Sequence, residues 1–397
     1  METYVVDWLN LGMRWLHLIA GIAWIGASFY FVWLDDHLAP PRDSNDRLRG
    51  VSGEVWAVHG GGFYRAQKYL LGPTGEPLSA SLHWFKWEAY TTWLSGMGML
   101  AIVYWWGANA YLIDRSVLEL SVPAAIAISA GSLVAGWLVY DAVCRVVKSE
   151  LALAVALFLL TVAAAWGYAQ VFGPRAAYIH VGAMIGTIMV WNVFFHIIPG
   201  QRKMVEAIRA GREPELRYGL IGKQRSVHNT YFTLPVLFTM MSIHYPMTYG
   251  HRHAWAVLAV IMLAGALIRQ YFVLRHSGQN PVALPAVAAA LLIGVAIAIA
   301  PSPSATSATT PATFARVQPI IQERCTVCHA EKPTFAGFQQ PPGGLLLDTP
   351  ERIKAAAQRI HQQTIATPAM PIGNLTKMTD EERRLLGAWL AAGAPLN

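Results

Sequence analysis

The chain has 397 residues, of which 54% are hydrophobic and only 13% are charged. A soluble domain carries about 25% charged residues, so this composition indicates a membrane protein. The net charge of +7 does not indicate nucleic-acid binding, because the basic residues fall between apolar segments and build no continuous patch.

Eight apolar segments are long enough to cross the roughly 30 Å of hydrocarbon in a bilayer. The first has neither the Lys/Arg-rich start nor the small-residue cleavage site of a signal peptide, so we expect it to be retained. We predict an all-α protein in which an eight-helix transmembrane bundle precedes a small all-α tail domain. The segments cover residues 11–34, 88–107, 119–141, 151–172, 176–198, 229–246, 254–274 and 282–300.

The basic residues of the connections predict the orientation. The first, third, fifth and seventh connections hold sixteen Lys and Arg residues, whereas the intervening connections hold three. Cytoplasmic loops carry an excess of these residues. We therefore expect the odd connections in the cytoplasm and both termini outside it.

The first connection, residues 35–86, is too long for a plain turn. Two short β-like runs flank Gly60, Gly61 and Gly62, which predicts a hairpin folded against the helix ends. Loops of this length are usually functional or disordered, and the aromatic content of this one argues against disorder.

Residues 301–313 consist of Pro, Ser, Ala and Thr. A segment without core-forming side chains indicates a flexible linker. It separates a membrane domain, residues 1–300, from a tail domain, residues 314–397. In the tail we expect helices at 314–324, 350–361 and 380–392, with Thr379-Asp-Glu-Glu as the start signal of the last.

Cys325, Cys328 and His329 form a Cys-x-x-Cys-His motif in the tail. Two thiols at this spacing can bond both vinyl groups of a haem while the imidazole takes the iron, so the motif predicts a covalent c-type haem. A zinc knuckle would need a second ligand pair, and the remaining cysteine, Cys144, lies far upstream. A redox dithiol would sit in a βαβ pattern, which the tail lacks. The tail is therefore predicted to be a cytochrome c domain.

The predicted haem also implies a compartment. Haem is joined to such cysteines on the oxidising side of the bacterial inner membrane. This places the tail in the periplasm, on the side that the basic connections predict for both termini. We expect a multi-pass protein of the bacterial inner membrane, with the lipid bilayer around it.

The haem iron needs a sixth ligand besides His329. Met370 lies in a loop between the second and third expected tail helices, where its thioether can reach the open face of the haem. Met378 and His361 are the competitors, but one directly precedes a helix and the other ends one, so both are better explained as structural. Methionine ligation raises the reduction potential, which suits an electron acceptor and relay.

Histidines of the membrane domain fall at two depths. The periplasmic set is predicted to supply a pair of ligands for a b-type haem, because ionisable residues within spans are candidates for function. Interhelical hydrogen bonding remains the alternative for each one. The periplasmic set is His17, His180 and His244, and the cytoplasmic set is His59, His83, His196 and His228.

Two further observations concern the same spans. A haem-copper oxidase would show His-x-x-x-Tyr and paired histidines inside spans, whereas His251 and His253 lie in a connection. Charged residues also lie in or at the edges of spans. Arg14 and Arg269 could orient an anionic substrate or a haem propionate, or could reach out to the interface.

Five segments of the membrane domain, together with the tail, carry a resemblance to a known family. They are residues 15–30, 59–64 (His-Gly-Gly-Gly-Phe-Tyr), 83–88, 192–201 and 226–231. The chain resembles the membrane-bound, cytochrome c-linked urate oxidases (urate hydroxylases) over its whole length. The resemblance implies oxidation of urate to 5-hydroxyisourate, with electrons leaving through the tail haem instead of producing hydrogen peroxide. The next acceptor would be a soluble cytochrome c or a respiratory-chain oxidase.

The first span separately resembles small membrane proteins that hold b-type haem through a histidine at this place, which supports His17 as a ligand. Urate gives up two electrons but a c-type haem accepts one at a time, so a second centre or two sequential transfers are required. We expect the cytoplasmic histidines to act near urate, where a neutral imidazole can take the released proton. An intramembrane haem would then bridge the roughly 30 Å of hydrocarbon.

Two other functions remain open from the sequence. One is an electron-transfer subunit that takes electrons from a quinol or a partner dehydrogenase. The other is a transporter with a fused cytochrome.

Overall fold

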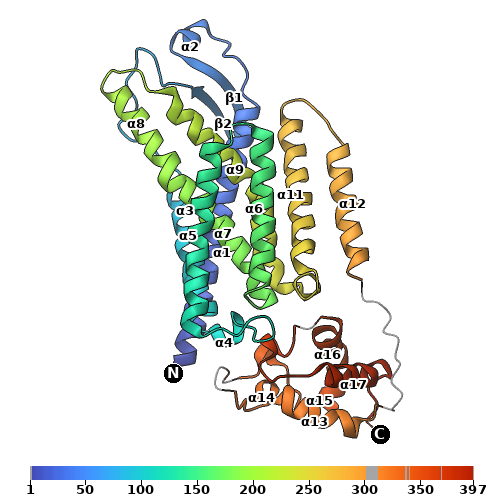
Figure 1. The fold of residues 1–397 in the computed structure, drawn as a ribbon. Coiled ribbons are helices and arrows are strands. Elements are labelled where there is room, and N and C mark those ends of the chain that lie inside the picture. Colours follow the sequence, from blue (N-terminus) through green and yellow to red (C-terminus); the bar gives the residue numbers. More distant parts are fainter. Residues whose placement is uncertain (1, 301–311, 336–337, 339, 368, 397) are drawn as a thin grey trace.

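The computed structural model describes residues 2–300, 312–335, 338, 340–367 and 369–396. The chain is 70% helix and 5% strand, so the predicted helical class is confirmed. The long helices run antiparallel to one another through one bundle (Figure 1). They are α1 (Glu2–Asp36), α3 (Trp87–Met99), α5 (Val122–Val146), α6 (Glu150–Ala169), α7 (Pro174–Asn192), α9 (Leu216–Met241), α11 (Ala254–His276) and α12 (Ala283–Ala298).

Five helical runs of the described chain are long and apolar enough to cross a membrane, which is consistent with a membrane protein. The five are Tyr4–Asp36, Val122–Val146, Glu150–Ala169, Pro174–Arg209 and Ala254–His276. The helix α12 is also apolar but shorter. The count of eight spans therefore stays a prediction.

Several helices begin where the sequence supplies a capping residue. Ser121 accepts a hydrogen bond from the backbone N–H of Ala124 at the start of α5, and Ser149 does the same for Ala152 at the start of α6. Such side chains satisfy backbone donors that have no partner inside the helix. The helix α7 begins with Pro174, whose missing N–H costs nothing in the first turn.

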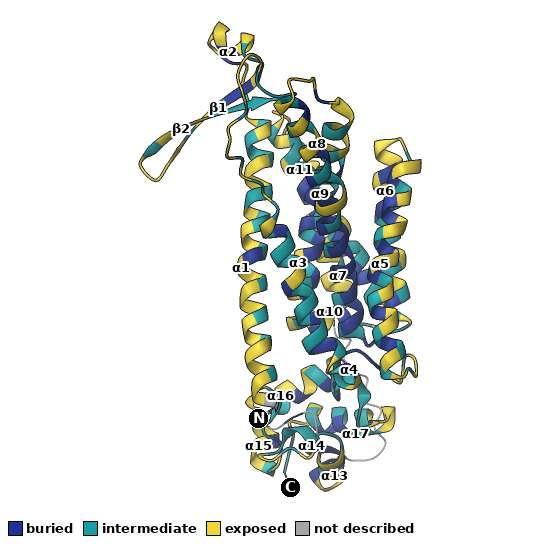
Figure 2. Cartoon of the chain, turned by 90° about the vertical axis from the view of Figure 1, so that its left-hand side faces the viewer, coloured by how far each residue is buried: buried dark blue, intermediate teal, exposed yellow. Residues whose placement is uncertain are grey.

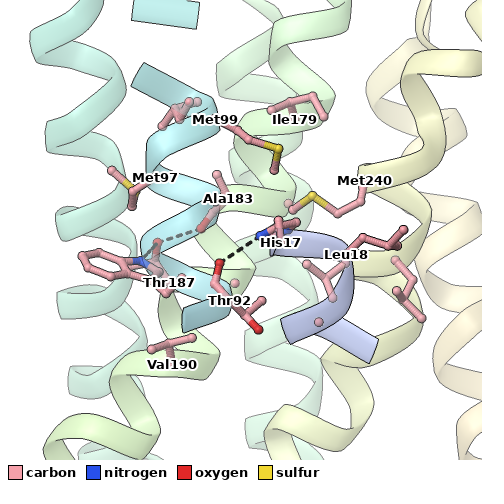
Figure 3. A pocket seen from close by; sticks show the side chains of 18 of the residues that line it. His17, Leu18, Thr92, Met97, Met99, Ile179, Ala183, Thr187, Val190 and Met240 are labelled. Carbon is pink, nitrogen blue, oxygen red and sulfur yellow. Dashed lines mark hydrogen bonds between the residues drawn. The ribbon is translucent and has the colours of Figure 1, made fainter. Parts of the chain in front are cut away.

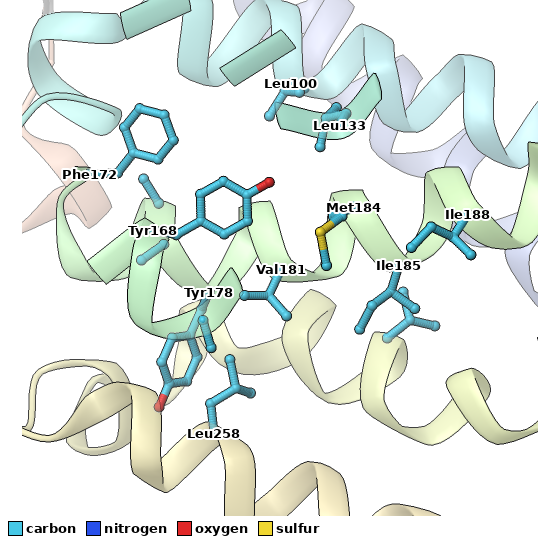
Figure 4. Close-up of a cluster of buried hydrophobic side chains, with 14 of the residues drawn as sticks. Leu100, Leu133, Tyr168, Phe172, Tyr178, Val181, Met184, Ile185, Ile188 and Leu258 are labelled. Carbon is cyan, nitrogen blue, oxygen red and sulfur yellow. The ribbon is translucent and has the colours of Figure 1, made fainter. Parts of the chain in front are cut away.

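The helix α7 is the centre of the bundle, and α1 lies at its edge. In the run that includes α7, 61% of the most apolar window is buried, against 6% for α1. Figure 4 shows Val181, Met184, Ile185 and Ile188 of α7 among side chains from neighbouring helices. In Figure 2, α1 is largely exposed along its length.

A glycine allows α7 and α9 to approach closely. A Cβ at Gly182 would lie 2.9 Å from Thr239 Cβ and closer still to its hydroxyl. Small residues at helix contacts in membranes let the backbones pack together. Any larger residue at position 182 would therefore force the two helices apart.

Two long helices depart from regular α geometry. The helix α3 continues into a π-helical segment, η1 (Leu100–Trp105), and α7 continues through η2 (Val193–Ile197) into α8 (Ile198–Arg209). Pro199 has no N–H to donate to the carbonyl of Phe195, so a regular α-helix cannot continue through η2. Segments of this kind are frequent at functional sites.

The expected ends of two spans were wrong. The span expected to end at 198 continues as helix to Arg209, and the span expected to begin at 229 begins at Leu216. Both extensions are polar helical segments, so a search for apolar segments does not include them. The hydrophobic length measures the hydrocarbon layer, whereas the helix continues beyond it.

The hairpin predicted in the first connection is present, but its turn projects away from the bundle instead of folding against the helix ends (Figure 2). The strands β1 (Val51–His59) and β2 (Gly62–Tyr69) pair antiparallel, with His59 opposite Gly62. Gly60 and Gly61 form the turn at φ values of 59° and 80°, in the left-handed region that glycine tolerates best. Arg65 pairs with Asp46, in the short helix α2 (Ser44–Leu48), and with Glu54.

The tail packs around its own small core of Ile321, Leu386 and Trp389. The expected first and last helices are confirmed as α13 (Phe314–Arg324) and α17 (Asp380–Ala391), and Thr379 and Glu382 form the predicted start as a capping box. The expected middle helix is divided into three pieces. They are α15 (Pro350–Ala355), α16 (Ala357–Ile360) and the π-helical η5 (His361–Ala366).

Short elements complete the described chain. They are α4 (Ala108–Tyr111), η3 (Ser242–His244), α10 (Pro246–Tyr249), α14 (Thr326–His329), η4 (Pro342–Gly344) and η6 (Ile372–Asn374).

The tail helices lie at the end of the bundle where α1 begins, and the hairpin lies at the opposite end (Figure 1). We call these the tail end and the hairpin end. The element η6 of the tail contacts the connection that contains α4, where a Cβ at Gly373 would lie 3.1 Å from the carbonyl oxygen of Ile113. Most of the predicted linker, residues 301–311, lies outside the described residues.

Candidate functional site

The tail motif lies in the short helix α14, with Cys325 at its N-cap. Cys325 and Cys328 are both free thiols. His329 Nδ1 lies 3.1 Å from the carbonyl oxygen of Leu345. A carbonyl can only accept, so Nδ1 carries the proton and Nε2 keeps its lone pair. Histidines that bind metals are usually held in this way.

Burial also affects the charge of these groups. It lowers the pKa of His329, which favours the neutral imidazole that binds iron. It raises the pKa of Cys325 to about 12 and raises that of Cys328 as well. Burial therefore favours the neutral form of all three side chains.

Met370 is half-buried in the loop that follows η5. Its N–H donates to the carbonyl of Gln363, and its own carbonyl accepts from Arg383 Nη1 at 2.8 Å. It lines a cavity of about 70 Å³ between the tail and the tail end of the bundle, which Tyr111 and Arg175 also line. The predicted ligand thus belongs to the surface through which the tail meets the bundle.

The competitors of Met370 occupy other positions. Met378 is buried in the tail core, with 3% of its surface exposed, and His361 is exposed. Met370 as sixth ligand stays a prediction.

In the membrane domain, the structure brings charged and polar side chains from three helices together in the hairpin half. We call them the Asp141 cluster. They are Tyr140, Asp141 and Arg145 of α5, Asn192 and His196 of α7 and η2, and Arg225, His228 and Asn229 of α9.

Asp141 is the charged centre of this cluster. Its carboxylate accepts from Arg225 Nη2 at 2.6 Å and from His196 Nε2 at 2.8 Å. Arg145 pairs with the other carboxylate oxygen at 2.6 Å. The Asp141 and Arg225 side chains are only 7% and 4% exposed. Two arginines against one carboxylate leave the cluster cationic.

Tyr140 joins His228 to the rest of the cluster. Its hydroxyl accepts from Asn192 Nδ2 at 2.8 Å and lies 2.8 Å from His228 Nδ1, to which it can donate its own proton. Asn192 Nδ2 also reaches Asn229 Oδ1 at 3.0 Å. The neutral His228 ring then has its proton on Nε2.

A second site is an apolar cavity of about 250 Å³ enclosed by α1, α3, η1, α7 and α9 (Figure 3). His17 lines it, and its Nδ1 lies 2.9 Å from the carbonyl oxygen of Thr92. His17 therefore repeats the arrangement of His329, with the proton on Nδ1 and, among the described residues, no hydrogen bond to Nε2; its Nδ1 also lies 3.2 Å from the Ser95 hydroxyl. The other lining is nearly all apolar, and the His17 ring packs against Gly96, where an added Cβ would lie 3.1 Å from Cε1.

The other two members of the periplasmic set do not line this cavity. His180 is fully buried on another face of α7, where Nδ1 donates to the carbonyl of Ala176 and Nε2 accepts from Ser129 at 2.7 Å. His244 lies exposed in η3. Only His17 of the predicted three is therefore placed to bind a group in the cavity.

The four histidines of the cytoplasmic set do not lie in one place. His196 and His228 both belong to the Asp141 cluster. His59 lies exposed at the hairpin turn, and the side chain of His83 is 69% exposed, 3.9 Å from Glu88. Two of the four predicted catalytic histidines are thus brought together. No group of three or more His, Cys, Asp or Glu side chains able to hold a metal ion occurs within the described ranges.

Most members of the Asp141 cluster are not among the site residues predicted from the sequence. The sequence places Arg225 in a connection, because the predicted apolar segment begins at residue 229, whereas the helix α9 begins at Leu216. Asn192 and Asn229 are amides in spans otherwise rich in apolar residues. A buried amide in a span is itself a signal, since it needs a partner within the protein.

A known protein family matches the membrane domain. The family described as urate oxidase N-terminal matches residues 3–300. The chain belongs to this family. The family implies an oxidoreductase that acts on urate. The match includes the Asp141 cluster and the His17 cavity and ends before the tail motif. No curated protein and no solved structure matches the chain.

Proposed function

We propose that the protein is a membrane urate oxidase that converts urate to 5-hydroxyisourate and passes the electrons to a c-type haem in its own tail. The observation that supports this most is the combination in one chain of a urate oxidase family match and a Cys-x-x-Cys-His motif with a free His329 Nε2. Cys325 and Cys328 would bond the haem, and His329 and Met370 would ligate its iron.

The reaction balances with two one-electron transfers. The urate monoanion and one water give 5-hydroxyisourate, one proton and two electrons. A haem held by Cys325, Cys328, His329 and Met370 would supply the one-electron redox chemistry that accepts these electrons. A soluble cytochrome c or a respiratory-chain oxidase would accept them next. His196 and His228 are the histidines of the cytoplasmic set best placed to take the proton, because both lie in the Asp141 cluster.

We further propose that the cavity beside His17 holds a b-type haem. The unprotonated Nε2 of His17 and the nearly apolar lining fit such a group. The cavity lies in the bundle that separates the Asp141 cluster at the hairpin end from the tail. On this proposal the protein sits in a bacterial inner membrane with both termini in the periplasm, and it comprises residues 1–300, a linker and residues 314–397.

The test is anaerobic addition of urate to the purified, oxidised full-length protein, with the absorption of the tail haem as the readout. Urate should reduce the haem without forming hydrogen peroxide. Reduction by a quinol but not by urate would instead support an electron-transfer subunit. A tail haem that neither donor reduces would overturn both functions.

A further inference from the structure

The Asp141 cluster contains buried polar atoms that its own hydrogen bonds do not satisfy. Within the described part of the chain, Arg225 Nε, Arg225 Nη1 and Asn192 Oδ1 are buried and have no hydrogen-bond partner. Buried donors and acceptors are normally paired, because leaving one unpaired costs about 1–3 kcal/mol. Such atoms indicate a missing partner when they converge on one place.

A third unpaired donor lies beside them. Trp137 Nε1 is buried without a partner among the described residues. Trp137 is one turn before Asp141 on α5, and its ring lies 6.4 Å from the ring of His196, which itself donates to Asp141. The unpaired atoms thus come from all three helices of the cluster.

Aromatic rings lie next to the polar side chains of the Asp141 cluster. Trp137 packs against Trp191 at 5.3 Å and against Phe195 at 4.9 Å between ring centres. Flat aromatic surfaces of this kind favour planar heterocycles. The side chain of His196 is 18% exposed and that of Arg145 is 71% exposed, so the cluster lies just below the surface of the hairpin half.

These features match the chemistry of a purine anion. Urate is planar, carries one negative charge, and presents several carbonyl oxygens and a few N–H groups along its edge. The cluster offers excess positive charge, three unpaired donors and one unpaired acceptor. A purely structural ion pair would need neither the surplus charge nor the surplus donors.

We propose that urate binds at the Asp141 cluster, with Arg225 holding the anion, Trp137 donating to a carbonyl oxygen and Asn192 accepting from an N–H of the ring. This inference rests on the proposed function, because it assumes that urate is the substrate. Asp141 acts as a positioning residue that fixes the orientation of Arg225. His228, held by Tyr140, lies beside the bound purine.

The test is equilibrium binding of radiolabelled urate to the full-length protein, kept reduced with dithionite so that it cannot turn the ligand over. Arg225→Gln should weaken binding about 10- to 100-fold, because it removes a charge-assisted hydrogen bond. Trp137→Phe keeps the ring but removes the donor, so it should weaken binding about 3- to 10-fold with the fold intact. A single symmetric elution peak of each detergent-solubilised variant, at the wild-type volume, shows that its membrane domain is folded.

Arg269 provides the matched control. It is also buried in the hairpin half, its Nε and Nη2 have no partner among the described residues, and it stacks on Phe29 at 5.2 Å as Arg225 stacks on Tyr140 at 5.0 Å. Unlike Arg225, it takes no part in the hydrogen bonds and ion pairs that define the Asp141 cluster. Arg269→Gln should leave urate binding within about twofold, as expected for a site away from the ligand.

The outcomes separate this inference from the function. If the wild-type protein binds urate and both Arg225→Gln and Trp137→Phe bind it equally well, or if Arg269→Gln alone abolishes binding, the assignment is wrong while the function stands. If the wild-type protein neither binds nor oxidises urate, the proposed function itself fails.

Discussion

The tail and the membrane domain each present a histidine whose Nδ1 is held by a backbone carbonyl, but they build it differently. His329 is held by Leu345, and its two cysteine neighbours are adjacent in sequence. His17 of α1 is held by Thr92 of α3, and the cavity around it takes residues from four long helices. The three motif residues of the first site lie within five positions of the sequence, whereas the second site exists only after the helices have packed. The comparison teaches that the hydrogen bond alone does not identify a ligand, because His37 and His180 also have Nδ1 bonded to a backbone carbonyl. His17 differs from both because it lines an apolar cavity.

The sharpest test of this comparison uses the double variant Cys325→Ser/Cys328→Ser of the full-length protein, in which any remaining haem is not covalent. We expect a b-type pyridine haemochrome. Adding His17→Ala should abolish it, because the free Nε2 is lost, whereas adding His180→Ala should retain it, because both nitrogens of His180 are already bonded. Loss of the signal with His180→Ala alone, or a double variant that contains no haem, would refute the His17 site.

A second prediction concerns Asp141, which has no counterpart in the tail motif. Asp141→Asn leaves Arg225 buried without its counter-charge, and breaking a buried ion pair costs about 3–5 kcal/mol. We expect a marked fall in the unfolding temperature of the detergent-solubilised protein. Asp35→Asn is the control, because the Asp35–Lys68 pair is exposed and contributes less than about 1 kcal/mol. Equal stability of the two variants would show that Asp141 is not the centre of the cluster.

A third prediction concerns the packing that brings α7 and α9 together. Gly182→Ala should destabilise the membrane domain by about 1–3 kcal/mol, because the added methyl overlaps Thr239. Gly167→Ala in α6 is the matched control, since a Cβ there meets nothing within 4 Å. It should be neutral or stabilising by up to about 1 kcal/mol. The measurement is the thermal unfolding temperature of both variants. An unchanged unfolding temperature of Gly182→Ala would contradict the close contact between α7 and α9.

The smallest expected effect lies in the tail and depends on pH. Burial tends to raise the pKa of Glu382, but hydrogen bonds from Arg324 and from the Thr379 N–H outweigh it and hold this pKa below its usual value of 4.5. A lowered folded-state pKa contributes stability above the unfolded value, and this stability is lost as pH falls through the folded pKa.

We expect the wild-type tail to lose about 1 kcal/mol more stability than Glu382→Gln as pH falls below 4.5. Urea unfolding followed by the tail haem absorption measures it in the full-length protein. Parallel pH profiles for the two proteins would show that the Arg324–Glu382 pair does not contribute.

The sequence predicted well what depends on neighbouring residues. The helix at 314–324, the capping box at Thr379 and the glycine turn of the hairpin each follow from a local signal, and each is present in the structure. His196 and His228 lie together in the hairpin half, as their shared position near span ends predicts, and their depth in a membrane stays a prediction.

The direction in which a side chain points around its helix was not predictable from depth. Ile179, Gly182, Ala183 and Gly186 of α7 share the face that lines the cavity, at spacings of three and four residues. His180 falls outside this face and points to Ser129 of α5. A histidine at the right depth can therefore lie on the wrong side of its helix, and hydropathy carries no information about which side that is.

The most direct test of the central claim is urate-dependent reduction of the tail haem under anaerobic conditions, measured in the wild-type protein and in Cys325→Ser/Cys328→Ser. The account predicts that two wild-type tail haems are reduced per urate consumed, with 5-hydroxyisourate as the first product and no hydrogen peroxide. It predicts that the double variant contains no covalent haem and transfers no electrons to added cytochrome c. Urate oxidation that continues in the double variant at the wild-type rate, or a wild-type tail haem that stays oxidised while urate is consumed, would contradict it.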